Sequence, residues 1–513
     1  MRVIDNKALE LRVHNPMQIT TAIPNSRSLG DGKVLVKWGL EEARVLRNLG
    51  VKKVPSPILG RYTWTGRFKP FEHQKTTAAF LTMNQRAFCF NEQGTGKTAS
   101  SIWASDFLIQ QGVIKRVLII CPLSIMDSAW RADLFSFAMH RKVDIAYGAR
   151  AKREEIIRGE AEYVIINYDG VEIVRDAIAE GAFDLIIADE ATHYKNTQSK
   201  RWKILNSLIQ PHTWLWMMTG TPAAQSPVDA YGLAKLINPK AVPRFAGAFK
   251  EMVMRKVTQF KWVPKETATT IVYDALQPAI RFTKDQCLDL PEMTYVKREV
   301  ELTPQQKKYY KMLKSQMIAV AAGEEITAAN AAVNMNKLLQ ISCGAVYSDS
   351  GETVEFDVKN RYKVLSEVIA ESSQKVLVFV PFKHVIGILS EKLTKDGITS
   401  EIINGDVSAS KRTAIFSRFQ TTPEPRVLII QPQAAAHGVT LTAANTIVWW
   451  GPVPSLETYA QANARVHRSG QNYPCTVVQL QGSAVEQRVY NLLDQKIGVH
   501  TKMIDLYREV LDN

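Results

Sequence analysis

The sequence contains few cysteines and no long apolar segment. Its five cysteines, Cys89, Cys121, Cys287, Cys343 and Cys475, are scattered without a CxxC pair, which argues against a zinc site and against a disulfide framework. We expect them to be buried thiols of a reducing compartment. The N-terminus has no apolar stretch of signal-peptide length, and no apolar run approaches bilayer length. These absences predict a soluble, intracellular, cytoplasmic protein without a membrane partner.

Acidic residues are also comparatively scarce, since 50 Asp and Glu stand against 64 Lys and Arg and give a formal charge of +14. Excess cations raise the local concentration of polyanions, so a nucleic-acid partner is favoured over a membrane surface. The 513 residues are too many for one hydrophobic core, so two to four domains are expected.

Short apolar runs recur along the chain, with helical patterns between them. Each run has about the length of a strand buried on both faces. They are Ala87–Phe90, Val117–Cys121, Tyr163–Ile166, Asp184–Ala188, Trp214–Met218, Val376–Val380, Val427–Ile430 and Thr446–Trp450. This alternation predicts an α/β fold in which helices cover parallel sheets.

The runs form two groups, separated by a stretch of about 130 residues without them. The segment before the first group carries no recognisable motif. The predicted organisation is therefore a small N-terminal accessory segment (1–65), a first parallel-sheet domain (66–235), a mainly helical insertion (236–360), a second parallel-sheet domain (361–485) and a C-terminal helix (486–513).

Two segments carry the sequence pattern of a helix start. Thr303-Pro304-Gln305-Gln306 combines a capping hydroxyl, a proline at the first helical position and a glutamine placed to bond back. Ser483 and Glu486 have capping-box spacing before an apolar pattern. Both segments are predicted to begin helices.

A glycine-rich turn follows the run Ala87–Phe90 and precedes a helical pattern. Strand, turn and helix in this order are the context in which a GxGKT sequence holds phosphates with backbone N–H groups. Lys97 would reach the β- and γ-phosphates, and the Thr98 hydroxyl would ligate Mg²⁺. Asn91 stands where the strict pattern has glycine, and asparagine tolerates positive φ. The predicted cradle is Asn91, Gln93, Gly94, Thr95, Gly96, Lys97 and Thr98.

Two further segments complete the predicted chemistry. Asp189 and Glu190 follow the run Asp184–Ala188, and would supply a carboxylate for Mg²⁺ and a base that orients water. Arg465 and Arg468 lie three residues apart, which places them on one side of a predicted helix, and guanidinium groups fit phosphate oxygens. A cradle and a distant arginine pair predict a nucleotide clamped between two domains.

These segments resemble, in the same order, those of the Swi/Snf-type members of helicase superfamily two. Beyond the cradle, matching stretches begin at Phe71, Pro122, Asp189, Thr219, Arg281, Ala436 and Gln461. The resemblance implies two RecA-like domains, ATP and Mg²⁺ as cofactors, adenine recognition by Gln74, and an arginine-finger role for Arg465 and Arg468. The sequence departs from the family pattern at Thr192, where the family has histidine, and in the segment that begins at Ala436.

The resemblance also implies further roles. Thr219, Gly220 and Thr221, together with Gln461, are expected to couple hydrolysis to domain motion. Contacts with DNA phosphates are expected from Lys195, Asn196, Gly438, Thr440 and Thr442. The long appended chromatin-reading domains of eukaryotic relatives are not seen, which is the pattern of a compact bacterial or phage-like member.

The expected function is a DNA-dependent ATPase that translocates on double-stranded DNA through its phosphate backbone. Remodelling of protein–DNA complexes or branched DNA would follow, with DNA-bound proteins as further partners and a monomeric state expected. One alternative is a DNA or RNA helicase that separates strands. Another, of a different class, is an ATP-regulated nucleic-acid clamp that does not hydrolyse ATP. A nuclease-linked or defence-system subunit is a third option, although no nuclease motif is visible.

Overall fold

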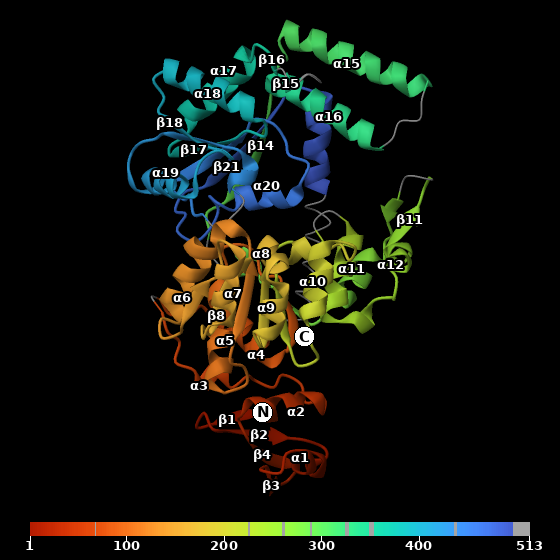
Figure 1. The fold of residues 1–513 in the computed structure, drawn as a ribbon, viewed down its shortest axis with the longest axis vertical. Helices are drawn as coiled ribbons and strands as arrows, with labels where there is room; N and C mark the ends of the chain where they lie inside the picture. Colours follow the sequence, from red (N-terminus) through yellow and green to blue (C-terminus); the bar gives the residue numbers. More distant parts are fainter. Residues whose placement is uncertain are drawn as a thin grey trace. The chain divides into compact units, whose positions relative to one another are not determined.

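The computed structural model describes residues 1–66, 68–223, 226–258, 262–287, 290–323, 328–347, 353–435 and 439–495. Residue contacts divide the chain into two compact units, the first running from Met1 to Cys287 and the second following it. The ribbon in Figure 1 shows the elements of each unit. Within the described ranges, none of the helices combines the length and the apolar character that crossing a membrane requires.

The first unit begins with a small module that contains an antiparallel sheet of order β1-β2-β4-β3 (Figure 1). Its elements are β1 (Arg2–Ile4), β2 (Ala8–Arg12), α1 (Pro16–Ala22), β3 (Arg27–Gly30), β4 (Lys33–Lys37) and α2 (Leu40–Asn48). Alternate residues of β2 and β4 are buried and pack with apolar residues of both helices. One face of this sheet is therefore core, while the other faces outward.

The main body of the first unit is a seven-stranded parallel sheet. In spatial order its strands are β13 (Ala279–Ile280), β5 (Arg86–Cys89), β10 (Trp214–Met218), β9 (Leu185–Asp189), β6 (Val117–Cys121), β8 (Tyr163–Asn167) and β7 (Val143–Ile145). Every pairing in this sheet is parallel. The carboxyl ends of all seven strands therefore meet at one edge.

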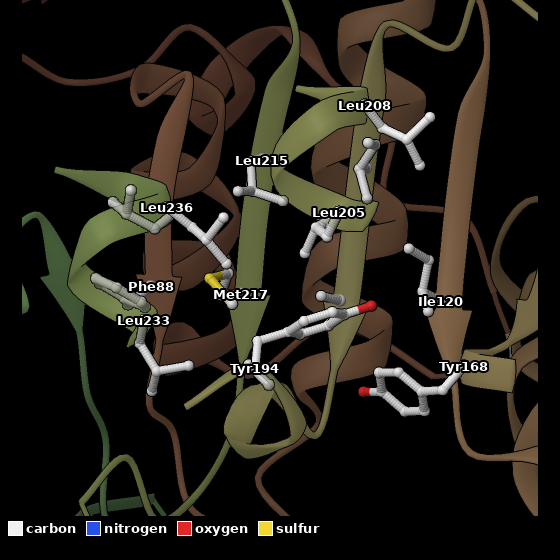
Figure 2. Close-up of a cluster of buried hydrophobic side chains, with 14 of the residues drawn as sticks. Phe88, Ile120, Tyr168, Tyr194, Leu205, Leu208, Leu215, Met217, Leu233 and Leu236 are labelled. Carbon is white, nitrogen blue, oxygen red and sulfur yellow. The ribbon is translucent and has the colours of Figure 1, made fainter. Parts of the chain in front are cut away.

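Helices cover both faces of this sheet. One face packs against α4 (Glu72–Met83), α5 (Lys97–Gln110) and α6 (Ala132–Phe137). The other packs against α8 (Tyr168–Ile173), α9 (Arg175–Glu180), α10 (Lys200–Leu208) and α11 (Ala230–Ile237). Figure 2 shows Phe88, Leu215 and Met217 on neighbouring strands, with Leu205, Leu208, Leu233 and Leu236 of the covering helices beside them. These side chains are almost entirely withdrawn from solvent, which fixes the sheet and its edge.

Further helices and a hairpin belong to the first unit. They are α3 (Ile58–Arg61), α7 (Arg150–Arg158), α12 (Ala246–Val253), α13 (Ala268–Ala275), α14 (Lys284–Cys287) and the hairpin of β11 (Met254–Lys256) and β12 (Trp262–Pro264).

The second unit contains a six-stranded parallel sheet. Its strands, in spatial order, are β14 (Met293–Glu299), β21 (Cys475–Gln481), β20 (Ala444–Trp449), β17 (Lys375–Phe379), β19 (Val427–Ile430) and β18 (Ser400–Ile403). Its helices are α15 (Pro304–Gly323), α16 (Ala328–Cys343), α17 (Lys359–Glu371), α18 (Lys383–Lys395), α19 (Ala409–Thr421) and α20 (Leu456–Asn463). A hairpin of β15 (Ala345–Tyr347) and β16 (Thr353–Glu355) follows α16, and residues 484–495 are helical.

The α/β class with two parallel-sheet domains is confirmed, and each of the eight apolar runs lies on a strand. The stretch 236–360, expected as one insertion, is instead shared between the units, because β13 joins the first sheet and β14 the second. Neither strand has a sequence signal that could reveal this. β13 has only two residues, and β14 is an edge strand without a fully buried residue.

Both predicted helix starts are confirmed. Thr303 and Gln306 exchange backbone-to-side-chain hydrogen bonds of 3.1 and 3.4 Å at the start of α15. At the second start, Glu486 N–H donates to Ser483 Oγ over 3.3 Å. Glu486 Oε2 accepts from Gly482 N–H over 2.7 Å. In each case a side chain satisfies a backbone group that the first helical turn leaves open.

Candidate nucleotide site

The glycine-rich turn lies between β5 and α5, at the carboxyl edge of the first sheet. Gly94 and Gly96 have φ values of 86° and 83°, a region that glycine enters without steric cost. Gly96 is the N-cap of α5, and no side chain caps that helix. The first backbone N–H groups of α5 therefore point out of the helix with no capping partner, as they do where a helix N-terminus binds an anion.

Lys97 holds its ammonium group above the beginning of this turn. Nζ donates to Asn91 O over 2.8 Å and to Glu92 O over 3.2 Å. Because an ammonium has three donors, one remains for a phosphate oxygen. Thr98, the other predicted ligand residue of the turn, is half-buried in the first turn of α5.

Asn91 fits the turn for a different reason from the one expected. It does not take a positive φ. Its fully buried side chain instead donates to Thr77 Oγ1 over 2.8 Å and accepts from Phe282 N–H over 2.9 Å. The amide thus ties the turn to α4 and to the segment after β13. A glycine could not make these two bonds, which accounts for asparagine at this position.

Gln74 and His73 of α4 hold the opposite side of the turn. Gln74 Nε2 donates to Thr95 O over 3.3 Å, and His73 Nε2 lies 2.8 Å from the same oxygen. Burial lowers the pKa of His73, so the neutral ring donates Nε2–H to that carbonyl. A Cβ built on Gly96 would lie 2.1 Å from Gln74 Nε2. A side chain at residue 96 would therefore have to displace the Gln74 amide.

Asp189 and Glu190 end the strand β9, two strands from β5. Asp189 is 9% exposed, and its Oδ2 accepts from Trp130 Nε1 over 3.0 Å. Burial raises the pKa of Asp189, whereas the positive charge of Lys97 opposes this rise. Glu190 has a φ of 55°, which is uncommon for a residue with a side chain. Tyr168 OH donates to the backbone oxygens of both acids and supports this turn.

Thr219, Gly220 and Thr221 follow β10, which lies between β5 and β9. Thr219 N–H donates to Cys89 O over 3.1 Å, and Thr221 N–H donates to Thr219 Oγ1 over 3.2 Å. The three predicted segments of the first unit are thus brought together at one sheet edge. Their separation along the chain does not predict this proximity, because the segments become neighbours only through the order of the strands in the sheet.

Arg281 makes a connection that its sequence position does not reveal. Its side chain is 3% exposed, and its Nη1 donates to Phe90 O over 3.0 Å and to Gly220 O over 3.3 Å. Nη2 lies 3.5 Å from Glu92 Oε1. Arg281 therefore joins the start of the glycine-rich turn, called the phosphate turn below after its predicted role, to the segment after β10. The sequence likewise did not indicate the contacts of Trp130 and Tyr168 with Asp189.

The residues present fit a nucleoside triphosphate with Mg²⁺. Two glycines in the left-handed region open the turn, the N-terminus of α5 is uncapped, and one ammonium stands over it. These are the donors that phosphate groups require. The Thr98 hydroxyl and the Asp189 carboxylate are oxygen ligands of the kind that Mg²⁺ prefers.

In the second unit, Arg465 and Arg468 do not lie on a helix, so that prediction is wrong. The helix α20 ends at Asn463, whose Oδ1 accepts from Trp449 Nε1 over 2.9 Å. Beyond it, contacts with residues 439–444 replace helical bonds. Arg465 O accepts from Leu441 N–H over 2.9 Å, and Arg468 Nη1 donates to Val439 O over 3.1 Å. These tertiary bonds hold the two arginines on a turn.

The remaining predicted residues have mixed surroundings. Gln461 is buried, with Nε2 3.4 Å from Glu457 Oε1. Lys195 forms an ion pair of 3.5 Å with Asp229, and Asn196 is exposed. Thr442 Oγ1 accepts from Gln420 Nε2 over 3.3 Å, and Thr440 is exposed. Gly438 lies outside the described residues.

Two family models match most of the chain. The model of the SNF2-related domain matches residues 73–345, and that of the Helicase conserved C-terminal domain matches residues 360–470. The chain is 23% identical over 470 residues to "Chromodomain-helicase-DNA-binding protein 1-like" of Danio rerio, covering 85% of this chain and 44% of that protein. It is 24% identical over 418 residues to an uncharacterized ATP-dependent helicase of Mycoplasma genitalium, covering 79% of this chain and 39% of that protein.

The chain thus spans less than half the length of these two relatives. Among solved structures, it is similar to the SWI2/SNF2 ATPase core of Sulfolobus solfataricus in complex with dsDNA. That match has 21% identity and a TM-score of 0.41, and covers 86% of this chain and 94% of the other. Because the SNF2-related model alone matches more than half of the 513 residues, this chain belongs to the SNF2-related family, with a helicase C-terminal domain following.

Proposed function

We propose that this chain is a DNA-dependent ATPase that translocates on double-stranded DNA and so remodels protein–DNA complexes or branched DNA. The observation that carries the proposal is the meeting of the phosphate turn, Asp189 and the Thr219–Thr221 segment at one sheet edge. The names of two relatives include "DNA-binding" and "ATP-dependent helicase". The formal charge of +14 favours an anionic polymer such as DNA as the partner.

Within the first unit, the turn and Lys97 would bind the β- and γ-phosphates, while Gln74 would contact the adenine. Thr98 and Asp189 would hold Mg²⁺, which when bound neutralises charge on the phosphate oxygens. Glu190 would orient the attacking water and accept its proton. Trp130 and Tyr168 keep these two acids in place through the bonds already described.

Arg465 and Arg468 belong to the second unit, so the proposed site is complete only when both units close on the nucleotide. An arginine finger typically contributes about 10³–10⁵ in rate. Hydrolysis would therefore be confined to the closed state, and product release would reopen it. If Lys195, Asn196, Thr440 and Thr442 grip the phosphate backbone from the two units in alternation, each cycle advances the protein along the duplex.

The proposal is tested by measuring phosphate release with single-stranded, duplex and forked DNA and with duplex RNA, at two salt concentrations. Duplex DNA should stimulate turnover most, and stimulation should weaken steeply with salt. Lys97→Ala and Arg468→Ala should each lose turnover, by about 10³-fold for the arginine. Lys115→Ala and Arg488→Ala, which remove exposed cations from the same two units, should behave as wild type.

The alternatives give different results in this experiment. Stimulation by single strands or RNA, but not by duplex DNA, would instead assign a strand-separating helicase. Comparable phosphate release by wild type, Lys97→Ala and Arg468→Ala would reject the assignment of the nucleotide site. Tight ATP binding without turnover in the wild type would point to an ATP-regulated clamp.

A further inference from the structure

The small N-terminal module presents one sheet face to solvent, and this face is rich in cations. In an antiparallel sheet, residues directly opposite each other point to the same side. The observed register pairs Arg2 with Glu10, Glu10 with Leu35, and Leu35 with Arg27 across all four strands. The outer face defined in this way consists of Arg2, Ile4, Ala8, Glu10, Arg12, Arg27, Lys33, Leu35 and Lys37.

The residues that alternate with the outer-face residues along β2 and β4 are buried, which confirms that the outer face is the solvent side. Leu9, Leu11, Val34 and Val36 are at most 1% exposed and pack against α1 and α2. The nine residues of the outer face include five cations and a single acid. All five cationic residues are exposed.

Three of these cations have no side-chain partner among the residues that the structure describes. Within the described residues, the side chains of Arg2, Arg12 and Arg27 make no hydrogen bond and no ion pair. Lys33 lies 3.8 Å from Glu10, and Lys37 lies 3.8 Å from Glu42. Arg12 and Lys33 stand directly opposite each other. Like charges in that position destabilise a sheet, and a bound anion would offset this repulsion.

The face lies at the opposite edge of the parallel sheet from the phosphate turn. The module is attached through Arg44, which donates to Thr82 O over 2.7 Å and stacks on Trp214. Arg47 donates to Asn84 Oδ1 over 2.9 Å. Thr82 and Asn84 precede β5, and Trp214 begins β10, whereas the phosphate turn follows the other end of β5. This face is therefore separate from the nucleotide site.

The spacing and composition of the face suit a nucleic-acid duplex. Arg2 and Arg27 lie on the two outer strands, three strand spacings apart, which is about 14 Å and comparable with the roughly 12 Å width of the major groove. The face has no aromatic residue, and aromatic residues provide the stacking platform that single strands use. Guanidinium groups match phosphate oxygens, and the aliphatic residues of the face, Ile4, Ala8 and Leu35, have no polar side-chain atom that could read base edges.

We propose that the outer face of the N-terminal module is a second DNA-binding surface, which holds the phosphate backbone of a duplex independently of ATP. This surface is distinct from the DNA contacts proposed above for Lys195, Asn196, Thr440 and Thr442. The family models begin at residue 73, so none of these residues belongs to the matched core. The inference extends the proposed function but does not depend on hydrolysis, because the binding is measured without nucleotide.

The test uses the full chain with a short fluorescein-labelled DNA duplex, without ATP or Mg²⁺, at several salt concentrations. Arg12→Gln with Arg27→Gln removes two unpaired cations of the face. Lys52→Gln with Lys53→Gln removes two exposed cations of the same module outside the face. The first pair should weaken duplex binding about ten-fold and flatten the log–log salt slope by about two. The second pair should leave both unchanged.

Arg12→Lys with Arg27→Lys should recover most of the affinity, because lysine keeps the charge that a phosphate contact needs. Thermal melting of all variants verifies that the module remains folded. Equal losses in the face and control pairs, or no loss in either, would overturn the proposal. So would a loss confined to duplex RNA, or a loss of binding to anionic lipid vesicles with DNA binding unchanged.

Discussion

Single side chains hold the nucleotide site together, and most of them do so through backbone atoms of other segments. Asn91 joins the phosphate turn to α4, and Arg281 joins it to Gly220. Lys97 bonds to the carbonyl groups of the turn. Asn91 and Arg281 would thus position the groups that contact the phosphates, although neither side chain contacts phosphate itself. Their loss is expected to affect turnover through geometry, since a misplacement of about 1 Å costs roughly 10²-fold.

Arg281→Met should test this directly. It retains the length of the buried side chain but loses the donors to Phe90 O and Gly220 O. We expect kcat to fall roughly 10²-fold while the KM for ATP changes little, because no phosphate contact is removed. Arg281→Lys should recover part of kcat. Steady-state kinetics with a parallel thermal melt distinguish this result from unfolding, and wild-type kcat in Arg281→Met would refute it.

Asn91→Ala should instead reduce stability. The substitution leaves Phe282 N–H without its acceptor and Thr77 without a donor, in a fully buried position. Leaving buried polar groups unpaired costs about 1–3 kcal/mol. Urea unfolding of the first unit measures the change. Asn48→Ala, at the exposed end of α2, should unfold as wild type, and equal midpoints for the two variants would argue against the anchoring role.

At the scale of elements, the start of α5 determines where phosphate would bind. The strand β5 is short and buried, the turn requires two glycines with positive φ, and α5 begins without a side-chain cap. The helix α4 packs against this turn through Gln74 and His73. The strand, the turn and the two helices thus form one local assembly, in which the position of each element restricts the position of the others.

Gly96→Ala is expected to disturb this assembly more than the same substitution at another glycine with positive φ. The added Cβ would lie 2.1 Å from Gln74 Nε2, and φ is 83°. Gly112→Ala, just beyond the other end of α5, has a φ of 68° but no heavy atom within 4 Å of its Cβ. Both variants should lose roughly 1 kcal/mol from backbone strain. Only Gly96→Ala should weaken ATP binding, as measured by calorimetry, and similar affinities in the two variants would contradict this.

On the scale of the whole molecule, the chain is two units with separate cores. The second unit depends on a buried ion pair between Arg361 and Glu486, whose side chains are 2% and 0% exposed and 2.7 Å apart. This pair ties the helix after β21 to α17. Because each unit has its own core, their unfolding need not be a single transition.

Glu486→Gln should therefore destabilise the second unit alone. An uncompensated buried charge typically costs about 3–5 kcal/mol, so an early transition should separate from that of the first unit in guanidinium titrations. Hydrogen exchange would locate the change in the second unit. Glu371→Gln, which breaks an exposed ion pair with Arg298, should shift unfolding by less than about 1 kcal/mol. A single shifted transition for both units would contradict the prediction.

The sequence by itself determined the local features. Apolar runs of strand length identified eight strands, and the capping patterns at Thr303 and Ser483 located two helix starts. The glycine-rich sequence located a turn between a strand and a helix. These features depend on residues close together in the chain, so periodicity and local hydrogen bonding are sufficient to reveal them.

Only the tertiary structure decided what depends on distant partners. The two-residue strand β13 owes its existence to β5, and Arg281 reaches Gly220 because β10 lies beside β5. Arg465 and Arg468 leave the helix because residues 439–444 compete for their backbone and side-chain bonds. The cationic outer face follows from cross-strand register. No short-range pattern encodes such contacts, since their free energy comes from segments that folding alone brings together.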